Sequence, residues 1–389
     1  MIPKNKPLQI KIFLIILLLL STLLILKPLF YEYYPDFSSY YYATYALLNG
    51  ENPYIVQADA FGPFIYPPTS LLLFLPFTLF QYIVAQKIFI ILSILSFLFS
   101  ITILLKLFKI TAFSNLGMLL IILSFNFFPA KFTLGMGQIN NFLLLALVFF
   151  VYYFIKKKPV LAGISLSLAI MIKISPIILI PFLIIRKDWK ILFSVFIMLI
   201  VLTLITDLII GHLVLVYFFN TTLPDLIKAA PAAYYNQSIT GFFARSVADP
   251  QFRNIIRLIM SVFLTLFSLF IIWKNYKNNF QYSILCISVL ITLGLIISGV
   301  SWQHHFVWLL LPIYFTYIYI KDKSLSKKYY FVLILSYLLT ALNIKNPISW
   351  PIFAQSHVFY GAIILYLLNL HFLMKIGKKT LSKSYKPRF

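Results

Sequence analysis

Two acidic residues that could act as a carboxylate base follow the first strongly hydrophobic stretch of the chain. They are Glu32 and Asp36, which lie four residues apart. The 389 residues contain only nine Asp and Glu, so few side chains are available for general-base chemistry. An ionisable group placed at a membrane surface is a functional candidate by default, and general bases are commonly carboxylates. We expect Asp36 to be the base and Glu32 to be the weaker candidate.

Asp36 has a second interpretation, as the N-cap of a helix. Pro35 precedes it, and an amphipathic pattern follows from Phe37 to Leu48. A carboxylate in this position can accept hydrogen bonds from the backbone N–H groups of Ser38 or Ser39. The two roles are compatible, because a cap also fixes the orientation of the carboxylate.

The elements that must position these residues are membrane helices. Hydrophobic residues make up 62% of the chain, and the mean hydropathy is +0.96. Apolar runs of about 17 to 25 residues recur throughout, and each is long enough to cross a bilayer. The alternating pattern of a membrane β-barrel is absent. The composition predicts one all-α polytopic membrane domain over residues 1–389, with about twelve crossings (range about 10 to 13). The predicted crossings are 12–30, 84–107, 116–130, 139–155, 160–173, 175–185, 191–211, 254–273, 280–299, 306–320, 329–344 and 356–374.

Charge distribution sets the orientation of these crossings. The net charge is +23, but the basic residues cluster at the ends of apolar runs, which indicates topology rather than nucleic-acid binding. With residues 1–11 and the basic tail 375–389 in the cytoplasm, most lysines and arginines lie inside. Seven of the nine acidic residues then lie outside: Glu32, Asp36, Glu51, Asp59, Asp207, Asp225 and Asp249. The predicted location is the cell (inner) membrane, with both termini cytoplasmic.

In this topology the unusual polar segments all reach the outer face. The first external loop, residues 31–81, is long and is expected to hold interfacial helices. Its stretch from Pro67 to Phe80 is apolar, but it is short and broken by prolines. The polar segments are the region around Asp36, Phe64–Thr69, Gly135–Asn141, Lys173 with Pro176, Tyr234–Arg245 and Ser301–His305. Their convergence predicts a shared cavity open to the outside and to the outer leaflet.

These segments together resemble glycosyltransferase family 87, whose characterised members are polyprenyl-phosphate-mannose-dependent α-mannosyltransferases. The similarity covers about residues 30 to 320, and its elements occur in the family's order. They are DFSSYYYATYALLNGENPY (36–54), IYPPT (65–69), GQINN (137–141), IKISP (172–176), NQSITGFFAR (236–245) and SWQHHFVWLLLP (301–312). The resemblance implies a GT-C fold, an active site that faces outward, and a catalytic carboxylate in the first external loop, where Asp36 matches.

Such an enzyme would transfer a hexosyl unit, with mannose the expected sugar, from a polyprenyl-phosphate donor to an acceptor hydroxyl. The base removes the hydroxyl proton, and in-line displacement inverts the anomeric centre. The leaving phosphate needs positive or donor groups, for which the candidates are Lys173, Arg245, His304 and His305. The candidates for contact with the sugar, the acceptor or the prenyl chain are Tyr66, Gln138, Asn140, Asn236, Gln237 and Trp302.

The sequence leaves several alternatives open. Lys173 could snorkel to the interface, the two histidines could end a helix, and the amides could join helices. Carboxylates do not cluster, so we expect no metal and no other cofactor. The partners would be the lipid-linked donor, a glycolipid or glycan acceptor and membrane lipids, without nucleic acid. The competing functions are a secondary transporter or lipid flippase, for which no internal repeat is evident, and a structural scaffold.

Overall fold

The structure, a computed structural model, describes residues 6–344 and 349–378, and its long elements are all α-helices. The predicted helical architecture is confirmed. Residues 1–5 and 379–389, which belong to the predicted cytoplasmic termini, lie outside the described residues.

Six helices of the described part are long and apolar enough to cross a membrane, and a seventh crossing results if the bent pair at residues 115–136 is one span. The chain is therefore a polytopic membrane protein. Other predicted crossings coincide with shorter apolar helices, such as Asn140–Ile155 and Pro159–Ile172. The count of about twelve crossings stays a prediction.

The chain divides into two compact units, which are interleaved along the sequence. Unit 1 comprises Met1–Ile174, Phe193–Ala229 and Trp302–Val307. Unit 2 comprises Ser175–Leu192, Ala230–Ser301 and Trp308–Phe389.

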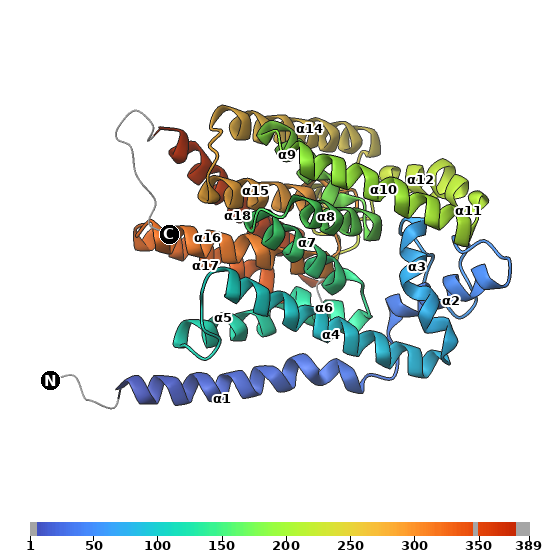
Figure 1. The fold of residues 1–389 in the computed structure, drawn as a ribbon, viewed down its shortest axis with the longest axis horizontal. Helices are drawn as coiled ribbons and strands as arrows, with labels where there is room; N and C mark the ends of the chain where they lie inside the picture. Colours follow the sequence, from blue (N-terminus) through green and yellow to red (C-terminus); the bar gives the residue numbers. More distant parts are fainter. Residues whose placement is uncertain (1–5, 345–348, 379–389) are drawn as a thin grey trace. The chain divides into compact units, whose positions relative to one another are not determined.

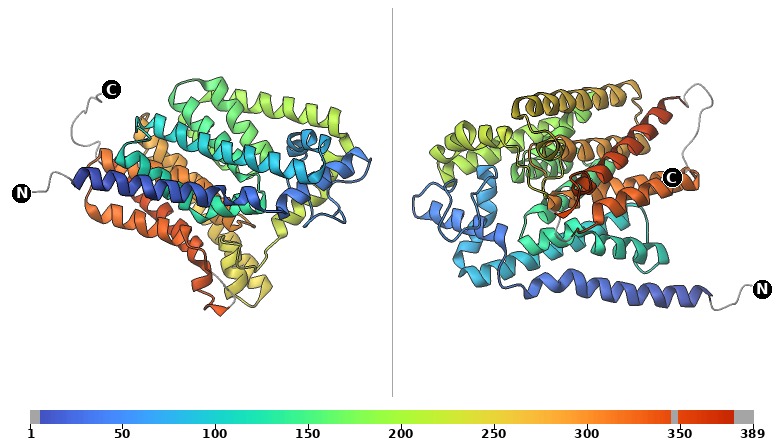
Figure 2. Two further views of the ribbon diagram at one scale, coloured as in Figure 1. Left: turned by 90° about the horizontal axis from the view of Figure 1, so that it is seen from below. Right: turned by 180° about the vertical axis from the view of Figure 1, so that it is seen from behind.

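In unit 1, two pairings of long helices form the framework. The first helix, α1, lies along α5, and α7 packs between α4 and α8 (Figures 1 and 2). Residues 31–81 contribute α2 and the short helices η2, α3 and η3, of which α2 and η3 pack on α4. The helices of unit 1 are α1 (Lys6–Leu26), η1 (Lys27–Phe30), α2 (Pro35–Leu48), η2 (Pro68–Ser70), α3 (Leu71–Phe74), η3 (Leu75–Leu79), α4 (Tyr82–Leu107), α5 (Asn115–Asn126), α6 (Phe128–Met136), α7 (Asn140–Ile155), α8 (Pro159–Ile172), most of α10 (Trp189–Ile210), α11 (His212–Tyr217), the π-helix η5 (Phe218–Thr222) and α12 (Leu223–Lys228).

In unit 2, α15 is the central helix and packs against α14, α16 and α18. The last two helices, α17 and α18, lie against each other. The helices of unit 2 are η4 (Ser175–Leu179), α9 (Ile180–Arg186), α13 (Ile239–Ser246), α14 (Pro250–Lys274), α15 (Phe280–Ile297), α16 (Leu310–Asp322), α17 (Lys327–Ala341), η8 (Ala354–Ser356) and α18 (His357–Lys378). The 3₁₀-helix η6 (Gln303–Leu309) begins in unit 1 and ends in unit 2.

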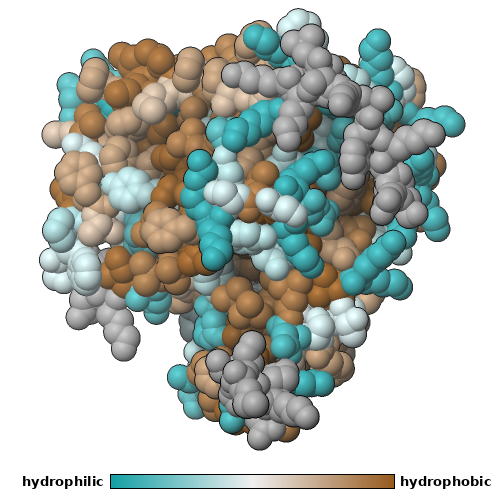
Figure 3. Space-filling view, turned by 90° about the vertical axis from the view of Figure 1, so that its left-hand side faces the viewer, coloured by the Kyte–Doolittle hydropathy of each residue, from teal (hydrophilic) through white to brown (hydrophobic). Residues whose placement is uncertain are grey.

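The candidate spans fall into two groups according to how much of each is covered by protein. In α1, α10 and α14 only 22%, 17% and 17% of the apolar window is buried, whereas the shares in α4, α15 and α18 are 61%, 78% and 67%. Brown apolar side chains accordingly reach the surface beside teal hydrophilic ones on the face shown in Figure 3. A soluble protein does not leave such helices uncovered, so lipid is expected to cover α1, α10 and α14.

Aromatic residues fix α2 in unit 1. Phe37 and Tyr40 are buried, with exposed fractions of 0% and 2%. The Phe37 ring lies 4.7 Å from Phe89 of α4, and Tyr40 stacks on Phe74 of α3 at 4.5 Å between ring centroids. Each such pair adds about 0.5 to 1.5 kcal/mol to the burial itself. The start of α2, which bears Asp36, is therefore held rigidly.

Candidate active site

The Asp36 carboxyl lies in the first turn of α2, and its Oδ2 oxygen is enclosed by protein. This oxygen has no hydrogen-bond partner among the described residues, while Gln138 donates to the carboxyl group. The cap interpretation is wrong: Pro35 is the first helical residue, Tyr34 is the N-cap, and no side chain caps the helix. Because buried polar atoms are normally paired, an oxygen left without a partner at a helix N-terminus is a functional candidate.

A glycine brings Gln138 to this carboxyl. Gly137 ends α6 with a left-handed φ of 70°, and a Cβ atom there would lie 2.7 Å from the Tyr34 Cβ and 2.9 Å from the Phe37 Cβ. Only glycine permits this approach of the α6–α7 connection to the start of α2. Gly137, the first residue of the GQINN segment, is therefore required by this packing.

Gln138 also organises two phenols. Its Oε1 atom accepts hydrogen bonds from the Tyr40 hydroxyl at 2.8 Å and from the Tyr66 hydroxyl at 3.0 Å. Asn140 Nδ2 approaches the same oxygen at 3.3 Å, and the Asn140 Oδ1 atom is buried without a partner in the described structure. Burial raises the pKa of both tyrosines, so both remain neutral hydrogen-bond donors.

Lys173 faces the same carboxyl from the end of α8. It interacts electrostatically with Asp36, and its Nζ atom lies 5.6 Å from the centroid of the Tyr66 ring. Nζ also lies 2.6 Å from the Nε2 atom of His305. Lys173 is half-buried, and both of these contacts are with residues of unit 1; the snorkelling interpretation stays open.

The two histidines are buried, each with 4% exposure. The His304 carbonyl accepts a hydrogen bond from the Thr133 hydroxyl at 3.0 Å, and the two imidazole rings are 4.7 Å apart. Both ring nitrogens of His304 are without a partner in the described part of the chain. Burial lowers the pKa of both histidines well below the usual value, so both rings are neutral at neutral pH.

Burial also governs the protonation of Asp36. It raises the pKa of Asp36 to about 7, while the Gln138 hydrogen bond and the charge of Lys173 act in the opposite direction. At neutral pH the carboxyl therefore exists in both forms, which is the condition that favours a general base.

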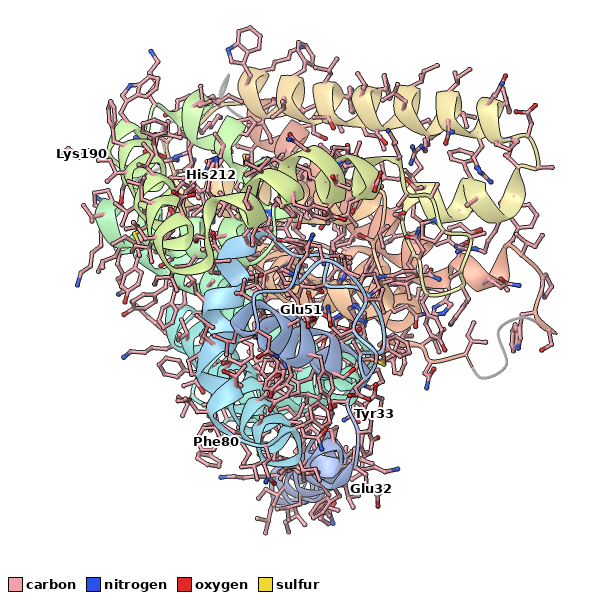
Figure 4. All side chains as sticks on the ribbon, turned by 90° about the vertical axis from the view of Figure 1, so that its right-hand side faces the viewer. Glu32, Tyr33, Glu51, Phe80, Lys190 and His212 are labelled. Carbon is pink, nitrogen blue, oxygen red and sulfur yellow. The ribbon has the colours of Figure 1, made fainter. Side chains whose placement is uncertain are left out.

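Glu32 is placed differently. It lies beside the end of α1 and next to Tyr33 (Figure 4), and it is exposed to solvent. Its backbone carbonyl accepts a hydrogen bond from Gln86 Nε2 at 2.8 Å. Trp302 is half-buried, and its backbone N–H donates to His305 Nδ1 at 3.2 Å.

Three further candidates belong to unit 2, where their polar atoms bind other parts of that unit. Asn236 Oδ1 accepts from Ser301 N at 3.0 Å, and its Nδ2 donates to the carbonyls of Pro231 and Gly299 at 3.1 and 3.2 Å. Arg245 Nη1 donates to the carbonyls of Ala233 and Asn236. These bonds hold the loop before α13 in place.

The side chain of Gln237 likewise binds backbone groups of unit 2. Its Nε2 atom donates to the carbonyls of Tyr234 and Gln355 at 2.6 and 2.7 Å, and its Oε1 accepts from Phe359 N at 3.3 Å. Arg245 Nη2 completes the set by donating to Ser356 Oγ at 2.8 Å. A role of these residues in ligand binding stays a prediction.

Two residues of unit 1 that lie at the candidate site were not among the candidates expected from the sequence. Tyr40 lies one helical turn after Asp36, and this i, i+4 spacing is a signal that places both side chains on one face. Gln303 is buried, and both polar atoms of its side chain are without a partner in the described structure. In the sequence, only its position next to the two histidines could have identified Gln303 as a candidate.

Comparison of the sequence with known proteins identifies the family. The family model of glycosyltransferase family 87 matches residues 64–299, which is more than half of the chain. The chain belongs to glycosyltransferase family 87. Asp36, His304 and His305 lie outside the matched residues of this family model, so their assignment depends on the geometry of unit 1.

A curated relative gives the comparison more chemical detail. The chain is 26% identical over 252 residues to the polyprenol-phosphate-mannose-dependent alpha-(1-2)-phosphatidylinositol pentamannoside mannosyltransferase of Mycobacterium tuberculosis (strain CDC 1551 / Oshkosh). The alignment covers 64% of this chain and 56% of that protein. The chain thus matches little more than half the length of its relative.

Proposed function

We propose that this family 87 protein transfers a mannosyl unit from a polyprenyl-phosphate donor to an acceptor hydroxyl at the outer face of the membrane. The observation that carries the proposal is the buried Oδ2 oxygen of Asp36, which has no partner among the described residues, in a carboxyl group that interacts electrostatically with Lys173. Family membership and the donor named for the relative support the sugar and the lipid phosphate.

Asp36 acts as the general base. Its Oδ2 oxygen accepts the proton of the acceptor hydroxyl as that oxygen attacks the anomeric carbon, which contributes about 10² to 10⁴ in rate. Attack opposite the leaving phosphate inverts the anomeric centre, so a β-linked donor gives an α-linked product. Tyr40, Tyr66 and Gln138 orient the carboxyl and bind sugar hydroxyls through their remaining hydrogen-bonding capacity.

The leaving phosphate is placed on the Lys173 side. Developing negative charge is stabilised there by the lysine and by an N–H group of His304, whose ring nitrogens have no partner in the described structure. The acceptor is a glycolipid or glycan hydroxyl, as the phosphatidylinositol mannoside acceptor named for the relative suggests. The reaction is proposed to need no metal ion.

The proposed location is the cell membrane, with both termini in the cytoplasm and the site outside. Shorter apolar helices such as α7 and α8 complete the proposed count of about twelve crossings. This orientation places Asp36, next to the end of α1, at the headgroup level, where a lipid phosphate presents its sugar.

The test is transfer without any ion gradient. Purified protein in nanodiscs receives polyprenyl-phosphate-mannose and extracted host glycolipids, and the product is identified by mass and by the configuration of its new bond. The proposal predicts α-linked mannosyl product and equimolar polyprenyl phosphate. Transport of the intact donor across sealed vesicles, with no product from any hexose donor, would establish the transporter alternative instead.

A further inference from the structure

The hydrogen bonds of His305 define which of its nitrogens bears a proton. The backbone N–H of Trp302 donates to Nδ1 at 3.2 Å, so Nδ1 is an acceptor and has no proton. A neutral imidazole with a bare Nδ1 has its proton on Nε2. His305 is neutral because burial holds its pKa well below the usual value.

This tautomer constrains Lys173. Its Nζ atom lies 2.6 Å from Nε2 of His305, and that nitrogen presents an N–H group. A lysine ammonium has donors only, so two donors would face each other across this contact. A neutral amine has a lone pair and accepts the N–H. The geometry therefore favours the neutral amine at Lys173 when no anion is bound.

The surroundings of Asp36 favour the neutral form of its carboxyl group. An ionised carboxylate normally draws several donors to both oxygens, yet Oδ2 has none among the described residues. Lys173 interacts electrostatically with Asp36, so the two groups belong to one site. A protonated Asp36 beside a neutral Lys173 leaves neither an unpaired buried charge nor a conflict of donors.

We infer that Asp36 and Lys173 share one proton, which resides on Asp36 in the resting protein and moves to Lys173 when an anionic phosphodiester binds. The binding of the donor thus creates the carboxylate base and the phosphate-binding ammonium in one step. His305 is the positioning residue, because its N–H group favours the neutral form of Lys173 until the anion arrives.

The proton balance closes over one turnover. Donor binding moves the proton from the Asp36 O–H to the Lys173 lone pair. During transfer the acceptor O–H gives its proton to Asp36 as the new C–O bond forms and the bond to the phosphate oxygen breaks. The Lys173 ammonium then gives its proton to the leaving phosphate monoester, which departs as a monoanion. Asp36 is again protonated and Lys173 again neutral, with no net proton exchanged.

The other titratable groups near the pair fit this sequence. Tyr40 and Tyr66 interact electrostatically with Asp36 and stay neutral, so they cannot compete for the proton. His304 and His305 face Lys173 and are neutral as well. The Tyr66 ring lies 5.6 Å from Nζ and stabilises the ammonium once it forms.

Infrared difference spectroscopy tests this switch directly. The protonated-carboxyl band of Asp36 is identified by its loss in Asp36→Asn and its retention in Asp59→Asn, which makes the same change at an exposed carboxylate of the same loop. The probe is a polyprenyl methyl phosphate, which is a phosphodiester with one negative charge and no sugar. We expect the band in the probe-free protein just below neutral pH and its loss when the probe binds.

Two substitutions of Lys173 give opposite predictions. Lys173→Arg keeps a permanent positive charge, so Asp36 should be ionised and the band absent even without the probe. Lys173→Met cannot accept the proton, so the band should persist after the probe binds. Either variant decides alone if the other fails to fold, as judged by thermal unfolding.

Absence of the Asp36 band in the probe-free wild type, or a band that the probe leaves unchanged, would overturn the inference. The switch rests on the function proposed above, but its readout does not require turnover. Mannosyl transfer without the band would remove only the switch, whereas a probe-sensitive band without mannosyl transfer would remove only the proposed reaction.

Discussion

The amide N–H group of Gln138 donates to the Asp36 carboxyl, while the Oε1 atom of the same side chain accepts from Tyr40 and Tyr66 at 2.8 and 3.0 Å. One glutamine thus connects the proposed base to two neutral phenols. This connection explains why the start of α2, the loop that bears Tyr66 and the α6–α7 connection meet at one point.

Replacement of this glutamine should weaken catalysis more than folding. In Gln138→Leu the carboxyl loses its donor and the phenols lose their acceptor. A hydrogen bond to a charged group is worth about 1.5 to 3 kcal/mol, so we expect kcat/KM to fall by about 10- to 100-fold. Steady-state mannosyl transfer at several donor concentrations measures this. A wild-type rate would show that Gln138 has no part in the site.

Gly137→Ala should disturb the same point by a steric route. The added Cβ would lie 2.7 and 2.9 Å from the Cβ atoms of Tyr34 and Phe37, and the residue has a φ of 70°. We expect a loss of stability of about 1 to 3 kcal/mol and lower activity. Gly62→Ala is the matched control, because nothing lies within 4 Å of its added Cβ. Equal melting temperatures for the two variants would refute the close approach.

The pH dependence of transfer should follow Asp36. Burial raises its pKa to about 7, and only the carboxylate acts as a base. If Asp36 kept its proton when the donor binds, the rate at saturating donor would increase with pH through about 7 and then level off. Because donor binding moves the proton to Lys173, we expect the midpoint at saturating donor to lie below about 7. A midpoint that stays at about 7 would contradict this proton transfer, and a rate that does not fall at acidic pH would contradict Asp36 as the base.

The same shift predicts a stability effect of opposite sign. The folded protein binds the Asp36 proton more tightly than the unfolded chain does, so stability falls as pH rises from the unfolded value of 3.8 through about 7. Asp36→Asn abolishes the ionisation and should remove this part of the decline. Melting temperatures of both proteins across this range measure it. If the melting temperatures of the two proteins changed with pH in parallel, the Asp36 carboxyl would be exposed to solvent rather than enclosed by protein.

Unit 2 offers a prediction about structure rather than chemistry. Asn236→Asp keeps the oxygen that accepts from Ser301 N but loses both donor bonds of Nδ2, to Pro231 and Gly299. We expect a loss of about 1 to 3 kcal/mol. Asn220→Asp, at an exposed position, serves as the control. If Asn236→Asp left the melting temperature unchanged and raised only KM, Asn236 would be a ligand-binding residue instead.

The sequence predicted the helical class, the polytopic membrane character and the helix over most of 37–48, because hydropathy and local pattern determine these features. It also could have placed the helix start, since proline favours the first helical position and Pro35 occupies it. The contact of Lys173 with His305 was beyond prediction, because 132 residues separate them and only the packing of unit 1 brings them together.

The same limit applies to the amide residues. Gln138 and Asn236 both stand in short polar motifs, and no local signal separates them. Packing distinguishes them. Gln138 reaches the Asp36 carboxyl through the close approach at Gly137, whereas Asn236 binds backbone groups of its own loop and of residues 299–301. Side-chain partners distant in sequence therefore distinguish a candidate site residue from a structural one.

The most direct test of the central claim is the rate of mannosyl transfer by Asp36→Asn at saturating donor, beside Glu32→Gln and Asp59→Asn. Asparagine keeps the shape of the side chain and removes the base. We predict a folded Asp36→Asn protein whose rate falls by about 10² or more, with Asp59→Asn at the wild-type rate. Wild-type turnover by Asp36→Asn together with loss of activity in Glu32→Gln would contradict the account and assign the base to Glu32.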